Sequence, residues 1–197
     1  MTEIIRVDAA PGVADTLGSV IATAFHPGDV NVWCVPDPEE RERLLPPHFA
    51  ILVEHALIHG DVYATADMTA VAVWFPNIKP MPDVPDYDNR IRAFAGPHAR
   101  RLIAIGETLA AGHPHEPHHY LNFLAVLPEL QGRNIGAALM AKHHAVIDAE
   151  GVPAYLEASG LRSRDFYLRL GYHDHGDPIV LPEDGPLMYP MWRPPAA

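Results

Sequence analysis

The chain has 197 residues and a formal net charge of -11, and 48% of its residues are hydrophobic, which predicts one globular domain over residues 1–197. The acidic balance argues against a nucleic-acid surface, because phosphates are bound by clustered Lys and Arg. No apolar run approaches the roughly 20 residues that cross a membrane, and the N-terminus lacks a secretory signal, so we expect a cytoplasmic protein without membrane contact.

The first part of the chain predicts a strand, two helices and a pair of strands. In chain order these are a strand over 4–7, helices over 13–25 and about 38–59, and strands over 61–65 and 70–75. The helices follow from apolar residues at helical spacing, and the strands from β-branched and apolar runs around a turn at Asp67-Met68. Pro46 and Pro47 should interrupt or kink the second helix.

The second part of the chain alternates helices and strands. We expect helical structure over about 88–111, a buried strand over 120–126, a helix over 135–150, a strand over 154–158, a helix over 165–170 and two strands between 172 and 192. Gly96-Pro97 should weaken the first of these helices, and Gly151 and Gly171 should end the two others. This order predicts a mixed α/β fold built on one central sheet.

The segment 124–139 contains the strongest functional signal. It reads as a buried strand, a turn of small residues and the start of a helix, whose free N–H groups suit a pyrophosphate. Gly132 and Gly136 let an anion approach the backbone. The spacing matches neither the dinucleotide nor the P-loop motif, so the residues alone leave two interpretations open, an anion site or an ordinary helix start.

This segment resembles the acyl-CoA signature of the GNAT superfamily. Gln131 to Gly136 fits the pattern Q/R-x-x-G-x-G/A, and the overlapping frame from Arg133 to Ala138 fits as well. Asn134 replaces the usual first glycine, and Asn tolerates left-handed backbone angles best among the other residues. The resemblance implies the GNAT acyl-CoA N-acyltransferase fold, with helices on both faces of a mixed sheet, and acetyl-CoA as co-substrate.

A second GNAT signature follows. Phe166 to Tyr172 matches F-Y-x-x-x-G-F/Y, and the resemblance implies that Tyr167 protonates the leaving thiolate; a packing role is the alternative. Ser163 stands where the family often has a pantetheine-binding Asn. The residues that the resemblance assigns to the cofactor are Leu124, Ala125, Val126, Gln131, Gly132, Arg133, Asn134, Ile135, Gly136, Ala137, Ala138, Ser163 and Tyr167.

Further segments are similar to puromycin N-acetyltransferase and its actinobacterial relatives. They are 70–74, 151–159 and 166–172, whereas 77–117 is the least similar. The resemblance implies direct acetyl transfer, through a ternary complex, to the primary amine of a small molecule such as a puromycin-like antibiotic or metabolite. The implied role resembles antibiotic resistance. A protein or peptide N-acetyltransferase and a non-catalytic acyl-CoA sensor remain as alternatives.

The acceptor side needs a base, because an amine attacks a thioester only when neutral. Glu157, at the end of its strand, is the candidate base, and a solvated strand-end glutamate is the alternative. Tyr120 and Asn122 should share one strand face with Leu124 and contact the substrate. The family resemblance implies that the Val126 N–H binds the oxyanion, and that the backbone at 124 and 126 binds the pantetheine arm.

Two tryptophans and a group of histidines complete the expected site. Trp33 and Trp74 begin two proline-rich segments, 33–49 and 74–85, that should cover the substrate pocket. The histidine cluster lacks the spacing of a zinc site, so we expect it to bind no metal. Its members are His113, His115, His118 and His119. We expect a mobile loop at the mouth of the substrate pocket, with His118 or His119 as proton carrier.

Two expectations concern the rest of the chain. Cys34 is the single cysteine, so it cannot form an internal disulfide, and no accompanying histidine and acid pattern supports a nucleophile. We therefore expect it to be inert. We expect a monomer or a homodimer, with the apolar residues 187–189 as a contact surface for a dimer.

Overall fold

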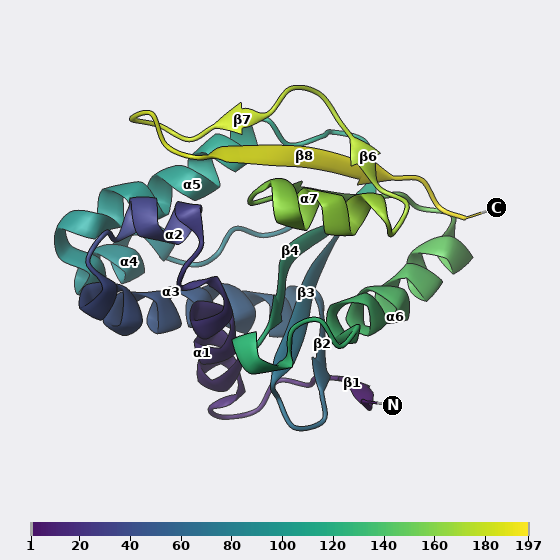
Figure 1. Cartoon of the computed structure of the whole chain (residues 1–197), viewed down its shortest axis with the longest axis horizontal. Coiled ribbons are helices and arrows are strands. Elements are labelled where there is room, and N and C mark those ends of the chain that lie inside the picture. The colour runs from purple at the N-terminus through teal and green to yellow at the C-terminus, as the bar shows by residue number, and fades with distance from the viewer. Residues whose placement is uncertain (1, 197) are drawn as a thin grey trace.

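The computed structural model describes residues 2–196 and consists of an eight-stranded sheet with helices on both faces (Figure 1). Its elements are β1 Ile4–Arg6, α1 Val13–Phe25, α2 Asp29–Cys34, α3 Pro38–His59, β2 Asp61–Thr65, β3 Ala70–Asn77, α4 Tyr87–Ala95, η1 Gly96–His98, α5 Ala99–Ala111, β4 His118–Val126, η2 Pro128–Leu130, α6 Ile135–Glu150, β5 Ala154–Ala158, α7 Leu161–Leu168, β6 His173–Asp174, β7 Ile179–Val180 and β8 Leu187–Arg193. The expected mixed α/β fold is confirmed.

The sheet has the order β1-β2-β3-β4-β5-β8-β6, and β7 also pairs with β8. Neighbouring strands are antiparallel except β4 and β5, which are parallel. In Figure 1, β8 runs across one end of the molecule while β2, β3 and β4 descend from it. The C-terminal part of the chain therefore extends the sheet beyond the parallel pair.

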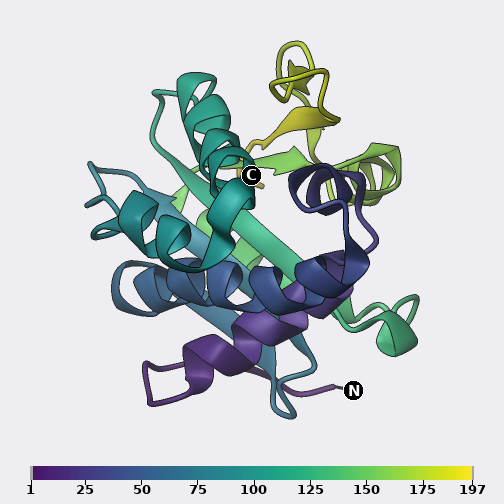
Figure 2. The same cartoon turned by 90° about the vertical axis from the view of Figure 1, so that its left-hand side faces the viewer.

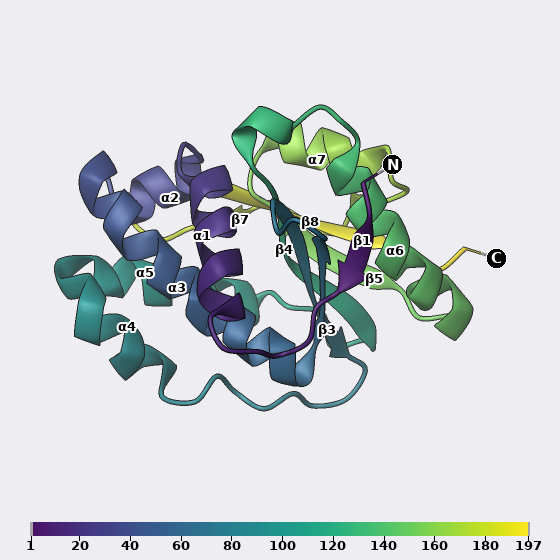
Figure 3. The same cartoon turned by 90° about the horizontal axis from the view of Figure 1, so that it is seen from below.

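Two apolar cores lie on opposite faces of the sheet. Seen from below, α1 and α3 lie on one side of the strands and α6 lies on the other (Figure 3). The first core contains buried residues of α1, α3, α4 and α5, and the second contains residues of α6 and α7. No helix within residues 2–196 has the length and apolar character that crossing a bilayer requires.

Helices α1 and α3 pack at close range, and α4 and α5 follow beside α3 (Figure 2). Gly18 permits this approach, because a Cβ built there would lie 2.9 Å from the Pro46 carbonyl oxygen. Helix α3 continues through Pro46 and Pro47, so of the two expected effects, interruption or a kink, the interruption does not occur. The carbonyls that lose a partner belong to the exposed Glu42 and Arg43, which water can reach.

Several boundaries differ from those predicted. The short helix α2 was not predicted. Helix α7 begins at Leu161, directly after Gly160, and not at the predicted residue 165. Strand β4 begins at His118, since Pro117 ends the preceding connection and the next residues pair with β3. The tail contains three short strands instead of two. The boundaries of α1 and α3 and the break at Gly96-Pro97 were predicted correctly.

Candidate active site

Strands β4 and β5 separate along their length. Their pairing is limited to His119 with Ala154 and Tyr120 with Tyr155, although β4 continues to Val126 and β5 to Ala158. A neighbour is therefore missing along the carboxyl-terminal halves of both strands. The unpaired backbone there can accept an extended ligand as an added strand.

The backbone groups of Leu124 and Val126 point into this gap. The Leu127 N–H donates to the Thr69 carbonyl at 3.1 Å, on the β3 side. Because successive residues of a strand direct their N–H and C=O groups to opposite neighbours, Val126 and Leu124 face away from β3. The Val126 carbonyl accepts a hydrogen bond from the Gln131 side chain at 3.1 Å. Gln131 thus ties the turn to the strand.

The start of α6 presents a row of free amides beside the gap. Gly132 and Asn134 have φ angles of 76° and 60°, so the turn uses the left-handed angles that Asn134 was expected to tolerate. The first helical bond is from the Ala138 N–H to the Asn134 carbonyl, at 3.0 Å. Among the described residues, the amides of 132–137 donate no hydrogen bond to protein. This arrangement suits a pyrophosphate.

Small residues bring α6 close to β4 and α7. A Cβ at Gly136 would lie 3.6 Å from Phe166 and 3.7 Å from Leu124, which is ordinary contact. Ala137 is half-buried, and Arg133 and Ala138 are exposed. Ile135 and Ala125 lie instead in the two cores, so only their backbones can meet a ligand.

The two α7 residues of the second signature line the site. Ser163 and Tyr167 both line a cavity beside the gap. The Ser163 hydroxyl donates to the Gly160 carbonyl at 2.9 Å, so it is held at the first turn of α7. Tyr167 is buried, and burial raises the pKa of its hydroxyl. The hydroxyl therefore stays protonated at neutral pH, as a proton donor must.

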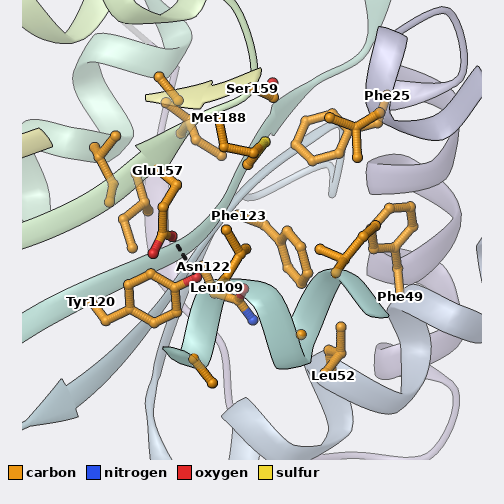
Figure 4. A pocket seen from close by; sticks show the side chains of 18 of the residues that line it. Phe25, Phe49, Leu52, Leu109, Tyr120, Asn122, Phe123, Glu157, Ser159 and Met188 are labelled. Carbon is orange, nitrogen blue, oxygen red and sulfur yellow. Dashed lines mark hydrogen bonds between the residues drawn. The ribbon is translucent and has the colours of Figure 1, made fainter. Parts of the chain in front are cut away.

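The gap opens into a cavity of about 690 Å³. Figure 4 shows Glu157 and Tyr120 at one end, while Phe25, Phe49 and Phe123 gather toward the other. The three phenylalanines meet edge to face, with ring centroids 5.2 to 6.2 Å apart. The cavity thus has a polar end and an aromatic end.

Glu157 is a buried carboxylate. Its side chain is 2% exposed, and its Oε2 accepts a hydrogen bond from the Tyr120 hydroxyl at 2.9 Å (Figure 4). Its Oε1 is buried and has no hydrogen-bond partner among the described residues. Burial and the negative charge of Glu157 raise the pKa of both Tyr120 and Tyr155. The solvated alternative for Glu157 is wrong.

Tyr120 and Asn122 do not share one strand face with Leu124 as expected, because β4 contains a β-bulge. Val73 of β3 pairs with Phe123, and Trp74 pairs with Leu121, so Asn122 is an extra residue without a partner. Tyr120 therefore faces the same core as Phe123, whereas Leu124 packs in the opposite core. Tyr120, Asn122 and Leu124 still border the cavity, because it spans the gap between the strands.

Neither tryptophan assigned to the substrate borders the cavity. Trp74 is fully buried on the α6 side and stacks on His143 at 4.3 Å, because alternation along β3 turns it away from the acceptor side. The Trp33 ring packs against Arg101, whose guanidinium carbon lies 5.1 Å from the ring centroid. Both proline-rich segments still contribute to the cavity wall, 33–49 through His48 and Phe49 and 74–85 through Asn77, Asp83 and Val84.

The histidine cluster is divided between a loop and a strand, with His113 and His115 in the connection between α5 and β4. His118 and His119 are strand residues, 1% and 2% exposed, because both pair with β3. His119 faces α6, where its Nδ1 lies 3.0 Å from His143, so it lies outside the cavity. His115 is exposed. Within residues 2–196, three or more potential ligand side chains nowhere gather as a metal site would require.

His48 was not predicted at this site, and His113 was expected in the loop at its mouth but without a role. His113 lies at the polar end, 3.8 Å from Glu157. His48 lines the aromatic end, and burial lowers its pKa to about 4, so its ring is neutral. Phe25 was predicted only as a helix residue, and Phe49 only as the end of a segment that covers the pocket. The apolar spacing of α1 and α3 marked the buried face but not which of its members border a cavity.

Cys34 and the apolar segment 187–189 were the subject of two further expectations. Cys34 is buried, and burial raises the pKa of its thiol to about 12, which agrees with an inert residue. Residues 187–189 belong to β8, which pairs with β5 on one side and with β7 on the other. Met188 is buried and borders the cavity. The β7 pairing covers one edge of β8 here, and the exposed Leu187 side chain leaves the dimer contact a prediction.

Comparisons with known proteins agree with this geometry. Residues 98–174 match the family model of the GNAT acetyltransferase domain. The chain resembles a crystal structure described as histone acetyltransferase HPA2 and related acetyltransferase from Corynebacterium glutamicum, with a TM-score of 0.73 and 24% identity over 100% of this chain and 98% of that one. It also resembles arylalkylamine N-acetyltransferase 2 from Aedes aegypti, with a TM-score of 0.58 and 12% identity over 98% and 99% of the chains.

A third similar structure contains the coenzyme. PaiA N-acetyltransferase from Thermoplasma acidophilum, in complex with coenzyme A, has a TM-score of 0.58 and 11% identity, covering 98% of this chain and 99% of that one. At these identities the likeness establishes the fold, that of the GNAT acyl-CoA N-acyltransferases.

Proposed function

We propose that this chain, which carries a GNAT acetyltransferase domain over residues 98–174, is an N-acetyltransferase that moves the acetyl group of acetyl-CoA to the primary amine of a small molecule. The amine attacks the thioester directly, with both substrates bound. A cytoplasmic location is inferred from the sequence alone. The observation that supports the proposal most is the buried carboxylate of Glu157, in a cavity that Tyr167 also borders.

The donor side consists of the gap and the start of α6. The free amides of 132–137 suit the pyrophosphate, and the strand backbone at Leu124 and Val126 suits the pantetheine arm. The free N–H of Val126 can donate to the oxyanion of the tetrahedral intermediate. Tyr167 supplies the proton for the departing thiolate.

Glu157 acts as the base in this proposal. A lysine-like amine, with a pKa of about 10.4, is almost entirely protonated at neutral pH and cannot attack. The partnerless Oε1 of Glu157 is the acceptor for its proton, while Tyr120 holds the other oxygen in place. Proton transfer of this kind contributes roughly 10² to 10⁴ in rate.

The aromatic end indicates the body of the acceptor. Phe25, Phe49 and Phe123 present ring faces and edges to the cavity, and His48 stays neutral there. Apolar walls favour an amine that carries an aromatic or bulky apolar group. A puromycin-like antibiotic or metabolite is one molecule of this class. Enclosure by α2 to α5 favours a small acceptor over a protein chain.

The test is CoA release from acetyl-CoA by the full chain across an amine panel. We expect kcat/KM to be higher for amines that carry an aromatic group, puromycin included, than for aliphatic polyamines or for peptides with a free N-terminus. Glu157→Gln should lower kcat by roughly 10² to 10⁴ and leave the KM for acetyl-CoA unchanged. Glu150→Gln, on the exposed side of α6, is the matched control and should retain kcat.

Two outcomes would favour the alternatives. Peptides that are acetylated faster than any small amine would make the chain a peptide N-acetyltransferase. Saturable CoA binding without release on any amine would indicate a non-catalytic sensor.

A further inference from the structure

His113 lies beside Glu157 at the polar end of the cavity. It comes from the connection between α5 and β4, and its side chain is 21% exposed. Its Nδ1 lies 3.8 Å from Glu157 Oε1, and its Nε2 lies 2.9 Å from His118 Nε2. Tyr120 and Tyr155 pack edge-on against its ring at 4.8 and 5.0 Å. His113 therefore connects the buried carboxylate to the protein surface.

The neighbouring His118 has a determined tautomer. Its Nδ1 lies 2.7 Å from the Glu116 carbonyl oxygen, and a carbonyl can only accept a hydrogen bond. The Nδ1 of His118 therefore carries a proton. Burial lowers the pKa of His118, so its ring is neutral and its Nε2 has a lone pair.

The tautomer of His113 follows from that of His118. Because His118 Nε2 is an acceptor, the 2.9 Å contact requires a proton on His113 Nε2. The Asn77 atom that lies 2.9 Å from that nitrogen in the structure is Nδ2, which could only donate. The two ends of an amide are assigned from their hydrogen bonds, so this tautomer of His113 requires Asn77 to be turned over, with Oδ1 accepting from Nε2. The opposite arrangement, with Asn77 donating to His113, needs a doubly protonated His118. Its burial opposes that charge.

These tautomers leave His113 Nδ1 as a free base directed at Glu157 Oε1, the oxygen without a partner. We propose that His113 is the proton outlet of Glu157: its Nδ1 accepts the proton that Oε1 takes from the acceptor ammonium, and the same nitrogen then releases that proton to water that enters the cavity. The inference rests on the proposed function. The separation of 3.8 Å needs a small side-chain adjustment or one bridging water.

The proton balance of the relay is simple. The bound ammonium loses one proton to Oε1, the carboxyl group passes it to Nδ1, and the imidazolium gives it to solvent while its Nε2 proton stays in place. Other titratable groups facing this path are Tyr120, Tyr155 and His118. Burial raises the pKa of both tyrosines, so they remain protonated, and His118 is held neutral. Among these groups, His113 is therefore the one that can accept the proton from Glu157.

The first test reads the tautomers without any turnover. Long-range proton–nitrogen NMR spectra of the full chain distinguish the two ring nitrogens, and the spectrum of His113→Gln assigns the His113 signals by difference. We expect neutral His113 protonated at Nε2 and His118 at Nδ1. A His113 protonated at Nδ1 would overturn the relay, whatever the enzyme acetylates.

The second test measures the relay in the acetylation reaction. His113→Gln should lower kcat about tenfold or more and leave the KM for acetyl-CoA unchanged. The exposed His115, two residues away, provides the matched control His115→Gln, which should retain kcat. Added imidazole should restore part of the kcat of His113→Ala and change its pH profile, because a free base can replace the missing one but not a missing packing contact.

The outcomes separate this inference from the proposed function. An active wild-type enzyme whose His113→Gln variant keeps both kcat and its pH profile would contradict the relay alone. A His113→Ala variant that imidazole leaves unchanged would also contradict it, since the residue would then serve structure. A wild-type chain that acetylates no amine would contradict the proposed function, and the NMR tautomers would still decide the state of His113.

Discussion

Tyr167 combines burial with a place on the cavity wall. Its ring lies 5.2 Å from Phe166 and 5.7 Å from Tyr172, which fix its orientation on α7. Burial raises the pKa of its hydroxyl, so the proton needed by a departing thiolate is present throughout the neutral range. A thiol with a pKa of about 8.5 is a fair leaving group even without help. The hydroxyl is therefore expected to assist turnover without being indispensable.

Tyr167→Phe should lower kcat by roughly ten- to a hundredfold and leave the KM for acetyl-CoA nearly unchanged. Steady-state CoA release measures both quantities. The matched control is Tyr172→Phe, which removes a buried hydroxyl that lies 3.1 Å from His144 Nε2. That variant should lose stability but keep kcat. Equal losses of kcat in the two variants would contradict a proton-donor role for Tyr167.

At the scale of elements, two helical glycines differ in their surroundings. A Cβ at Gly18 of α1 would lie 2.7 Å from the Ala50 backbone nitrogen and 2.9 Å from the Pro46 oxygen, both in α3. A Cβ at Gly106 of α5 would meet nothing within 4 Å. Backbone atoms cannot move aside as a flexible side chain can, so Gly18 determines how closely α1 and α3 approach.

Gly18→Ala should destabilise the chain by about 1–3 kcal/mol, because the added methyl group forces α1 away from α3. Gly106→Ala should stabilise it by about 0.5–1 kcal/mol, since alanine is the better helix former and the site has room. Urea unfolding of both variants checks the opposite signs. A neutral Gly18→Ala would show that the helices adjust without strain.

At the scale of the whole molecule, buried neutral histidines make the fold sensitive to acid. Burial lowers the pKa of His48 to about 4, of His143 to about 3 and of His144 to about 4. In the unfolded chain a histidine has a pKa of about 6.5. Between about pH 6.5 and 4 these histidines are therefore protonated in the unfolded state and neutral in the folded state. The free energy of unfolding consequently falls as the pH falls.

Each of these histidines should remove up to about 1.4 kcal/mol of stability for each pH unit in that window. Urea midpoints at several pH values between 7 and 4.5 measure the slope. His48→Phe should flatten it, because a phenyl ring has no proton to bind and the buried His48 Nδ1 has no hydrogen-bond partner among the described residues. His115→Gln, at an exposed site, should leave it unchanged. A slope that His48→Phe does not alter would contradict this origin.

The sequence predicted much of the local structure, for reasons visible in particular residues. Apolar spacing and the flanking turns defined α1 and α3 to the residue, and Gly151 ends α6 in a left-handed conformation. The short helix α2 was missed because six residues cannot establish a helical period. The predicted start of β4 was late because His118 and His119 are polar residues buried by pairing with β3.

The sequence by itself determined the mixed α/β class, the small-residue turn before α6 and the place of Glu157 near the end of its strand, because these features depend on neighbours in the chain. The tertiary structure alone decided the bulge at Asn122 and the contact between His113 and Glu157. A bulge shifts strand alternation by one residue, and a cavity forms only where distant segments meet. Neither property is encoded by local periodicity.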